Sequence, residues 1–290
     1  MKRLLLASAV ASALAAPMAA QAQAPATPSS VTGNMTIASD YRFRGISQTF
    51  KGPTIQGGID YSHSSGLYLG NWNSNVSGLL YNAGPGIEMD FYGGWKHSWG
   101  DLGLDLGVLH YYYGDANQKG CDVTCTNFSD NTYNNTELYI GGSWKWLSLK
   151  YSHAITNYFG LNGQVGNNFV SQSCAKSATC TFVYNTDVMG DHGDSKGTGY
   201  LDLSASFEIA PKLTLGAHAG HLSVKNYGSY LNYTDYKVGL NYDLNGWSLG
   251  AAAIGTNAKS DWYYNVGNKN SANFKDLGKT TLVLSVGKTF

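Results

Sequence analysis

Strict alternation of apolar and polar side chains over long segments is the feature that most constrains the fold of this chain. Between positions 87 and 99 the odd positions carry mostly apolar or aromatic residues, whereas the even positions include Glu88 and Asp90. Successive residues of a β-strand point to opposite faces, so a period of two predicts a strand with one apolar and one polar face. The alternation resumes after Gly100 and Asp101, which predicts a hairpin with a two-residue turn.

The same alternation recurs along the chain and predicts about twelve strands. Short turns are expected near residues 63–65, 100, 147, 211 and 245, and longer loops at 77–85, 114–132, 160–196, 225–230 and 257–277, with one brief loop-side connection at 47–52. This arrangement is typical of an all-β, transmembrane antiparallel up-and-down β-barrel with short periplasmic turns and long extracellular loops. The alternative, a secreted sandwich, has strands of about 5 to 6 residues and would leave long strand edges unpaired.

The N-terminal segment predicts export from the cytoplasm. It begins with Lys2 and Arg3, continues with small and apolar residues, and ends with Ala-Gln-Ala sequences that fit a signal-peptidase site. We therefore predict a cleaved signal peptide at residues 1–24, a short linker at 25–32 and a single barrel domain at 33–290. Removing Lys2 and Arg3 from the 19 Lys and Arg residues leaves 17 against 19 Asp and Glu. No basic cluster remains, so nucleic acid is not expected as a partner.

The segment IASDYRFRGISQT, residues 37–49, interleaves charged residues with aromatic rings. On a strand, this parity directs Tyr41 and Phe43 toward lipid, and Asp40, Arg42 and Arg44 toward the interior of the barrel. A charge that faces lipid near the midplane costs about 2 to 4 kcal/mol, so the parity is expected to be firmly set.

Charged residues at interior-facing positions are the candidate pore lining. The sequence places six basic and ten acidic residues there: Arg42, Arg44, Lys96, Lys145, Lys150 and Lys237 against Asp40, Asp60, Glu88, Asp90, Asp105, Glu137, Asp202, Glu208, Asp235 and Asp243. Rings of such charges set ion selectivity in pores, so a mild preference for cations is predicted. The alternative is that these groups pair across the barrel as a structural network that leaves little open space.

Aromatic residues gather where the predicted strands approach the short turns. A girdle at the membrane interface accounts for Trp95, Trp99, Trp144, Trp146, Tyr242 and Trp247. The alternation in GLYLGNWNSN is ambiguous, and we place Tyr68 and Trp72 on the apolar face. Rings that face the interior, such as Tyr92, Tyr111 and Tyr139, are the alternative candidates for stacking on a sugar.

Four cysteines lie in two predicted loops, and disulfides are expected in an exported chain. We predict the pairs Cys121 with Cys125 and Cys174 with Cys180, although four cysteines permit three connectivities. A zinc site is the alternative, but no histidine cluster completes it. Mass spectrometry of unreduced peptides is expected to show both bonds, and free thiols would contradict the prediction.

Catalytic and cofactor sites are not predicted. The segment GDHGDSKG places Asp191, His192, Asp194 and Ser195 within five residues, but members of a catalytic triad usually come from separate segments. A Gly-rich polar loop explains this composition. His218 is predicted to be a hydrated residue of the barrel wall. No metal or other cofactor is expected.

Several segments resemble a known family. ASDYRFRGISQT, PTIQGGIDYSHSSGLYLGNWNSNV, EMDFYGGW and the ending LSVGKTF resemble the TorF family of putative porins of Gram-negative bacteria, and the resemblance covers essentially the whole mature chain. It implies an outer-membrane barrel and passive transport, without an established substrate. The terminal Phe290 resembles the signal that barrel assembly machinery recognises, whereas Lys288 departs from the apolar preference at its position. Near the rim, its ammonium group can reach the headgroups.

The sequence therefore predicts a porin-like channel in the cell outer membrane for passive diffusion of small hydrophilic solutes or ions. The expected partners are outer-membrane lipid, the assembly machinery and small solutes. The alternative is a closed barrel that acts as a structural or surface-binding protein through its long loops. Twelve strands lie between the roughly 8 that enclose only side chains and the roughly 16 that enclose an aqueous channel, so strand number leaves both functions open.

Overall fold

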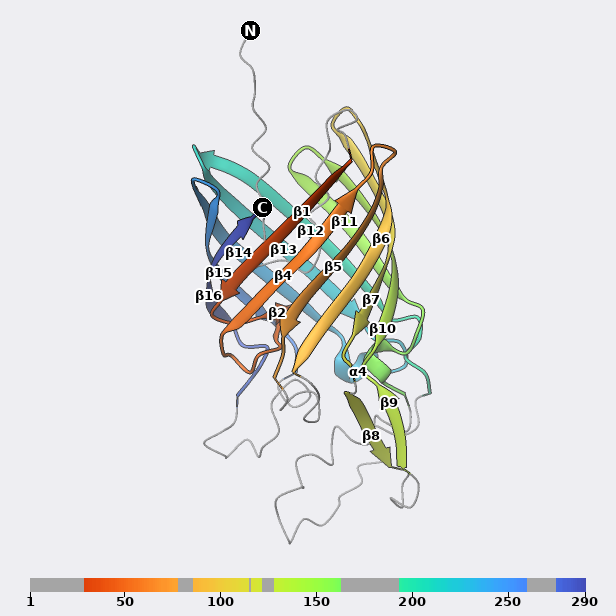
Figure 1. Cartoon of the computed structure of the whole chain (residues 1–290). Coiled ribbons are helices and arrows are strands. Elements are labelled where there is room, and N and C mark those ends of the chain that lie inside the picture. The colour runs from red at the N-terminus through yellow and green to blue at the C-terminus, as the bar shows by residue number, and fades with distance from the viewer. Residues whose placement is uncertain (1–28, 78–85, 115, 122–127, 163–192, 260–274) are drawn as a thin grey trace.

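Twelve antiparallel strands close into a barrel in the computed structural model of the chain, which describes residues 29–77, 86–114, 116–121, 128–162, 193–259 and 275–290 (Figure 1). The strands are β1 Ser30–Ala38, β4 Thr54–Ser62, β5 Leu67–Asn75, β6 Ile87–Trp99, β7 Leu102–Tyr112, β10 Asn135–Trp144, β11 Leu147–Ala154, β12 Gly199–Ala210, β13 Leu213–Ser223, β14 Tyr233–Leu244, β15 Trp247–Thr256 and β16 Thr281–Thr289. Each strand pairs with its neighbours in sequence, and β1 pairs with β16 to close the barrel. The predicted twelve-stranded up-and-down barrel is confirmed. Strand β1 begins at Ser30, inside the segment predicted as a linker.

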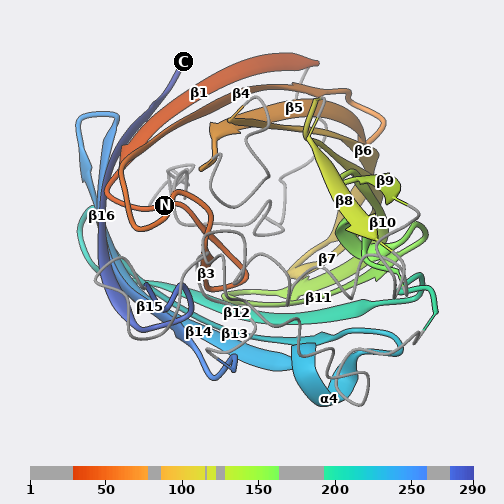
Figure 2. The same cartoon turned by 90° about the horizontal axis from the view of Figure 1, so that it is seen from below.

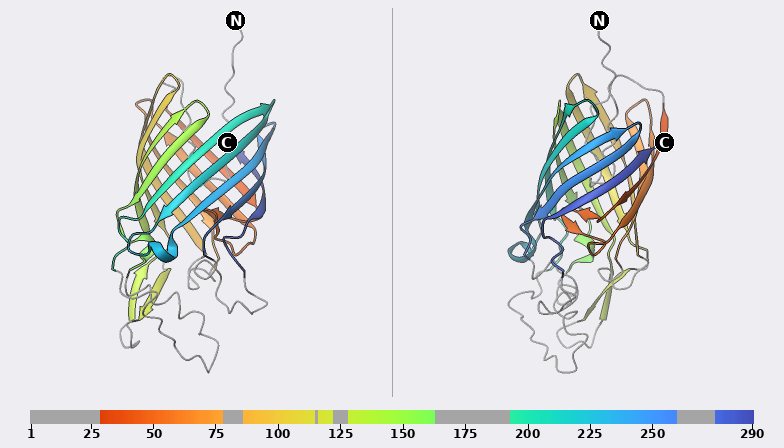
Figure 3. Two further views of the ribbon diagram at one scale, coloured as in Figure 1. Left: turned by 180° about the vertical axis from the view of Figure 1, so that it is seen from behind. Right: turned by 90° about the vertical axis from the view of Figure 1, so that its left-hand side faces the viewer.

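Short turns gather at one end of the barrel and long connections at the other, which we call the turn end and the loop end (Figure 3). The hairpin of β8 Asn117–Cys121 and β9 Phe128–Thr132 extends beyond the loop end in Figure 1. A 3-10 turn, η1 Tyr158–Gly160, and a short helix, α4 Gly228–Leu231, also lie at this end. No helix in the described ranges has the length and hydropathy to cross a membrane.

The outer surface of the barrel is apolar. Many aliphatic and aromatic side chains that point outward from the strands are at least 38% exposed, including Met35, Ile37, Ile59, Leu69, Phe91, Val108, Ile140, Leu203, Val238, Leu249 and Leu284. At the turn end the outward residues include Trp99, Trp144, Trp146, Tyr242 and Trp247, as the sequence predicts for an interfacial girdle. The ammonium group of Lys288 lies 5.0 Å from the ring centre of Trp247, where an amphipathic side chain covers an apolar ring.

The predicted orientation of β5 is wrong. Leu67 and Leu69 are exposed on the outer face, whereas Tyr68 is buried inside the barrel and donates a hydrogen bond to Asp105. Trp72 also points inward, because its ring packs edge-on against the buried Tyr41. The outer face of this strand carries polar Asn71 and Asn73 beyond its leucines, and these two amides bond one another. Because these two polar residues stand at outward positions, the alternation of apolar and polar residues in β5 does not show which face is which.

The predicted course of the chain after Ala38 is also wrong. Strand β1 ends at Ala38, and residues 39–53, which we call the inner loop, turn into the barrel before β4 begins (Figure 2). Tyr41 and Phe43, predicted to face lipid, are 6% and 8% exposed inside the barrel. The brief connection predicted at residues 47–52 is therefore the last part of a longer inward segment.

A small hairpin shapes the inner loop. It pairs β2 Arg42–Phe43 with β3 Ile46–Ser47. Arg44 and Gly45 form its turn with φ angles of 46° and 79°, the combination that two-residue hairpins require. A Cβ atom on Gly45 would lie 2.8 Å from the Cβ of Asp235. Only glycine therefore lets the turn approach the barrel wall this closely.

Candidate functional site

Arg44 joins the inner loop to the opposite wall of the barrel. Its Nη2 atom lies 2.7 Å and 3.0 Å from the two carboxylate oxygens of Glu137 on β10, and its Nη1 atom donates to the hydroxyl of Tyr158 over 3.0 Å. The guanidinium also lies over the ring of Tyr200 on β12, 4.1 Å from its centre. Asn135 donates to Glu137 and so fixes the carboxylate. We call Glu137, Asn135, Tyr158 and Tyr200 the Arg44 site.

Burial strengthens the electrostatic interaction between Arg44 and Glu137. The side chains of Arg44 and Glu137 are each 3% exposed, so neither charge is solvated by bulk water. Burial raises the pKa of Tyr158 to about 12, although the Arg44 charge opposes the rise. The Tyr158 hydroxyl therefore stays neutral and accepts from Arg44. A buried ion pair costs desolvation of both charges, and removal of one partner leaves the other charge uncompensated.

Arg42 and Asp40 organise the inner loop itself. Arg42 donates from Nε to Asp40 over 2.5 Å and from Nη1 to the carbonyl oxygens of Gly45 and Leu277 over 3.0 Å and 2.9 Å. The other oxygen of Asp40 accepts from the hydroxyl of Ser47 over 2.6 Å. The pattern Asp-x-Arg-x-Arg therefore holds a folded loop, in which Arg42 joins the loop to the segment before β16 and Arg44 reaches the opposite wall.

Aromatic packing covers the rest of the inner loop. The hydroxyl groups of Tyr41 and Tyr113 each donate to Glu88 over 2.7 Å. Phe43 packs edge-on against Tyr111 and Phe159, with ring centres 5.4 Å and 5.6 Å away. Two buried clusters result: one contains Tyr41 and Phe43, and the other contains Ile46 with Leu161, Tyr200, Leu222, Val224, Tyr227, Leu231, Tyr233 and Leu277.

The inner loop and its clusters close the barrel toward the loop end. Each of the twelve strands contributes an interior residue there that is no more than 5% exposed: Thr36, Gln56, Ser74, Glu88, Tyr111, Glu137, Ser152, Tyr200, Leu222, Asp235, Ile254 and Val283. Toward the turn end the interior-facing residues Asn34, Asp60, Lys96, Lys150 and Asp202 are partly exposed. Water therefore reaches the interior from the turn end, whereas the described conformation is closed below the loops.

Alternating charges line the accessible half of the barrel. Lys96 lies opposite Asp105 on the neighbouring strand, and Lys150 lies opposite Asp202. The two ammonium groups also lie over the rings of Tyr68 and Tyr139, each 5.4 Å from the ring centre. The hydroxyls of these tyrosines share a hydrogen bond. The charges and rings thus form a connected polar belt along the wall.

His218 is held between two carboxylates, which sequence reasoning missed. Its Nε2 atom lies 2.7 Å from Asp235, and its Nδ1 atom lies 3.2 Å from Asp202. Ser204 lies 3.2 Å from the same Nδ1 atom but donates to Asp202 over 2.7 Å. Both ring nitrogens thus face carboxylates, so the ring lacks a free acceptor for the Ser204 proton, as a catalytic base would need. His218 lies on β13 and its partners lie on β12 and β14, so only the register of these three strands brings them together.

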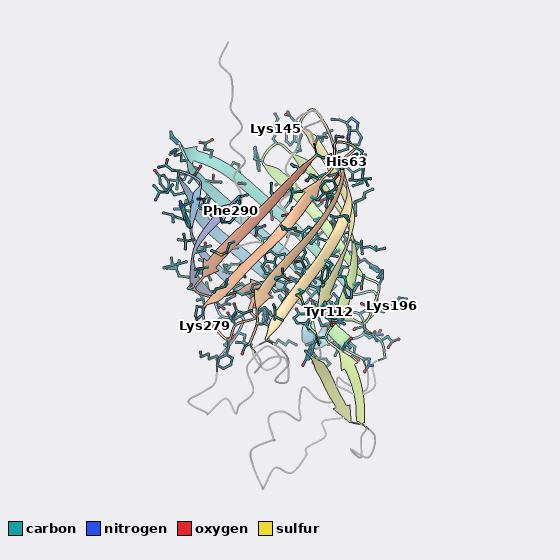
Figure 4. All side chains as sticks on the ribbon, viewed as in Figure 1. His63, Tyr112, Lys145, Lys196, Lys279 and Phe290 are labelled. Carbon is teal, nitrogen blue, oxygen red and sulfur yellow. The ribbon has the colours of Figure 1, made fainter. Side chains whose placement is uncertain are left out.

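The structure places the predicted pore-lining residues in three settings. Asp40, Arg42 and Arg44 lie on the inner loop, and Asp60, Glu88, Asp90, Lys96, Asp105, Glu137, Lys150, Asp202, Asp235 and Lys237 lie on interior-facing positions of the strands. Lys145 does not face the interior. It lies in the β10–β11 turn with a φ of 54°, and its side chain is 51% exposed, 3.9 Å from Asp101 (Figure 4). The tight turn redirects a side chain that strand parity would point inward.

Other predicted residues fall partly outside the described ranges. Cys125, Cys174 and Cys180 lie outside them, and Cys121 ends β8 without a described side chain, so the disulfide pairing stays a prediction. Asp191 and His192 also lie outside them. Ser195 is buried and donates to the carbonyl of Leu161 over 2.5 Å, which is a structural contact within the loops. Across the described part of the chain, no group of three or more His, Cys, Asp or Glu residues is arranged to hold a metal ion.

A family model described as "Bacterial protein of unknown function (Gcw_chp)" matches residues 22–290. The chain belongs to the Gcw_chp family. The matched region contains the whole described barrel and the inner loop, so both are parts of the Gcw_chp domain. The TorF name stays a prediction. No curated protein matches the chain.

Solved structures with similarity to this Gcw_chp protein are outer-membrane barrels. The KdgM porin is 9% identical, with a TM-score of 0.46, and the match covers 89% of this chain and 98% of that one. OmpT of Vibrio cholerae is 12% identical, with a TM-score of 0.38 and coverage of 92% and 98%. At these identities and TM-scores, the similarity carries no conclusion about the function of this chain.

Proposed function

We propose that the chain is an outer-membrane channel for passive diffusion of small hydrophilic solutes or ions, closed in the described conformation by its inner loop. The observation that carries this proposal is that one segment closes a barrel whose interior toward the turn end is lined by charged and polar residues. That segment leaves the wall at Ala38 and returns at Thr54, which are paired neighbours. Apart from the bond between Ser39 and Leu284 on β16, the inner loop can therefore move without breaking contacts between the strands of the barrel.

The apolar outer surface supports a membrane location. Exposed aliphatic side chains surround the barrel and aromatic rings mark its turn end, as in barrels that span an outer membrane. We propose the turn end as the periplasmic end. Phe290 is 70% exposed and its backbone pairs with Gly33 at the β1–β16 junction. This placement makes it available to assembly machinery, which we propose as a partner during insertion.

The charge of the wall favours cations once the inner loop moves. The described interior-facing wall residues include seven carboxylates, Asp60, Glu88, Asp90, Asp105, Glu137, Asp202 and Asp235, against the three lysines Lys96, Lys150 and Lys237. When the inner loop moves out of the barrel, Arg42 and Arg44 move with it, so these two positive charges leave the pore. Because fixed charge along a pore sets ion selectivity, we expect the open channel to prefer small cations. Catalysis has no part in this proposal.

A closed barrel that binds partners at the cell surface is the second candidate. The observation that favours it is the β8–β9 hairpin, which extends beyond the barrel (Figure 1). In this case the buried charges of the inner loop serve only as a structural network.

Conductance across a planar bilayer tests the channel. We expect the refolded wild type to show rare stepwise openings, because the inner loop closes the described conformation. In a salt gradient the reversal potential of these openings is expected to favour cations. A reproducible anion preference would overturn the proposed selectivity. A folded barrel that stays silent even without its inner loop would favour the surface-binding function.

Substitution on the outer face tests the membrane location. We expect Val238→Lys to reduce folding stability in lipid vesicles by about 2 to 4 kcal/mol, because it places a charge against hydrocarbon at the middle of β14. Urea titration of the vesicle-inserted protein measures the effect. The matched control is Asn241→Lys, three residues along the same strand and on the interior face. Equal losses for the two variants would contradict a lipid-facing outer wall.

A further inference from the structure

We propose that the Arg44 site is a binding site for solutes that carry a guanidinium group, and that such solutes open the barrel by replacing Arg44. The second half of this inference rests on the proposed channel function, whereas the first half concerns binding alone. In the described conformation Arg44 acts as a tethered ligand of its own wall.

The Arg44 site has the chemistry that recognises a planar guanidinium. Glu137 supplies a carboxylate, Tyr158 supplies a hydroxyl acceptor, and Tyr200 supplies a ring face 4.1 Å from the guanidinium carbon. A guanidinium is planar, presents its donors in a fixed fork and stacks on aromatic rings, which an ammonium group does less well. The site therefore distinguishes guanidinium compounds from simple amines.

The site belongs to the barrel and not to the inner loop. Glu137 and Asn135 lie on β10, Tyr200 lies on β12, and Tyr158 is fixed through its backbone N–H to the hydroxyl of Ser195. Asn135 holds Glu137 through a side-chain contact on the same strand. Removal of Arg44 therefore leaves a formed carboxylate and ring face, which makes the site ready to accept another guanidinium.

The local charge favours a cationic occupant. Asp90, 2% exposed, has an oxygen with no hydrogen-bond partner in the described ranges. It shares the interior face of β6 with the buried Glu88, and it lies opposite Tyr111 on β7. Tyr111 in turn lies opposite Asn135 on β10. With Arg44 withdrawn, the buried carboxylate of Glu137 lacks its cation, and a buried unpaired carboxylate is strongly unfavourable.

Across the described ranges, few backbone hydrogen bonds tie the inner loop to the rest of the chain: the N–H of Ser39 donates to Leu284, that of Ser47 to Leu277, and that of Ser77 to Gln48. The β2–β3 hairpin has two residue pairs. Arg44, Phe50 and Lys51 adopt φ angles of 46°, 59° and 57°, which are uncommon for residues other than glycine. Side-chain contacts, with the Arg44 site prominent among them, therefore hold the loop in place. A solute that occupies this site removes a main anchor.

Binding to the vacated site is the first test. Purified Arg44→Ala in detergent is expected to bind agmatine and methylguanidinium at least about tenfold more tightly than the wild type, measured by isothermal titration. Putrescine, which has amines in place of the guanidinium, is the ligand control. Lys51→Gln is the matched variant, because it removes one positive charge from the same loop at a residue that is not part of the Arg44 site. Adding Glu137→Gln to Arg44→Ala is expected to abolish the gain.

Displacement of the inner loop in the wild-type protein is the second test. It uses no variant, so it does not depend on whether a substituted chain folds. Chymotrypsin can cleave after Tyr41, Phe43 and Phe50 once the inner loop leaves the barrel. We expect agmatine, but not putrescine, to increase the rate of these cleavages several-fold, with mass spectrometry of the peptides as the readout. Equal effects of the two compounds, or binding by Lys51→Gln and not by Arg44→Ala, would overturn the inference.

Conductance separates this inference from the proposed channel. Agmatine is expected to raise the open probability of the wild type in a planar bilayer. If the barrel without its inner loop conducts while agmatine neither binds Arg44→Ala nor opens the wild type, the guanidinium inference fails and the channel stands. If agmatine binds Arg44→Ala and no form conducts, the site is supported and the channel fails.

Discussion

Replacing residues 39–53 by a two-residue Asn-Gly turn is expected to convert a mostly silent barrel into a conducting pore. Ala38 and Thr54 are paired neighbours, and Asn-Gly is the turn that best joins such a pair. The replacement removes the segment that covers the ring of buried wall residues and leaves the twelve strands intact. We expect the current across a bilayer that contains the protein to rise by at least about tenfold, because the inner loop no longer fills the interior of a barrel wider than the roughly eight-stranded barrels that side chains alone fill.

A turn at the opposite end supplies the control for this experiment. Replacing Pro211 and Lys212 by Asn-Gly introduces the same two-residue turn into the β12–β13 connection but touches no inner-loop contact. Its currents are expected to match the wild type. Gel electrophoresis with and without heating checks that each barrel is folded, because a folded barrel resists denaturation until it is heated. If the folded barrel without its inner loop carries no current, the interior is closed by the wall itself, and the channel proposal is wrong.

Glu137→Leu is expected to release the inner loop. The substitution leaves the buried guanidinium of Arg44 without its carboxylate, and breaking a buried ion pair in this way costs about 3 to 5 kcal/mol. Because the inner loop can leave while the barrel stays paired, we expect this cost to appear as loss of the closed conformation. Chymotryptic cleavage after Tyr41 and Phe43 measures it directly, since both residues are buried in the wild type.

A double substitution distinguishes charge from shape. Arg44→Met combined with Glu137→Leu removes both charges and keeps apolar volume, so it is expected to restore much of the resistance to cleavage. Glu208→Gln, at an exposed position of β12, is the control and is expected to behave as the wild type. Equal cleavage of the single and double variants would show that the ion pair does not hold the loop.

The sequence predicts the barrel wall well because wall residues obey a local rule. Lipid on one side and a polar interior on the other impose a period of two on each strand, as in β6 and β14. Lys145 departs from this period because it lies in a tight turn that directs its side chain outward. Strand β5 departs from it because Asn71 and Asn73 lie on the outer face, where their side chains form a hydrogen bond with one another. Both departures depend on contacts that a single segment does not reveal.

The inner loop was mispredicted because its sequence also obeys the rule. Asp40, Arg42 and Arg44 alternate with aromatic residues as they would on a strand, although both sets are buried. The partner of Arg44 lies 93 residues away in the sequence, and His218 likewise meets carboxylates from other strands. Such partners are set by strand register, which alternation within one segment does not determine. A clue was present in Gly45, which can form the hairpin turn that a continuous strand does not need.

The junction of β1 with β16 links the closing of the barrel to the closing of its interior. Arg42 on the inner loop donates to the carbonyl oxygens of Leu277 and Lys279, which come just before β16. These carbonyls reach Arg42 only when the last strand has paired with the first. During insertion, the N-terminal part of the chain therefore gains its final anchor from the C-terminal part. A barrel that has not yet joined its two ends lacks these Arg42 contacts, so we expect its inner loop to be held less firmly than in the completed fold.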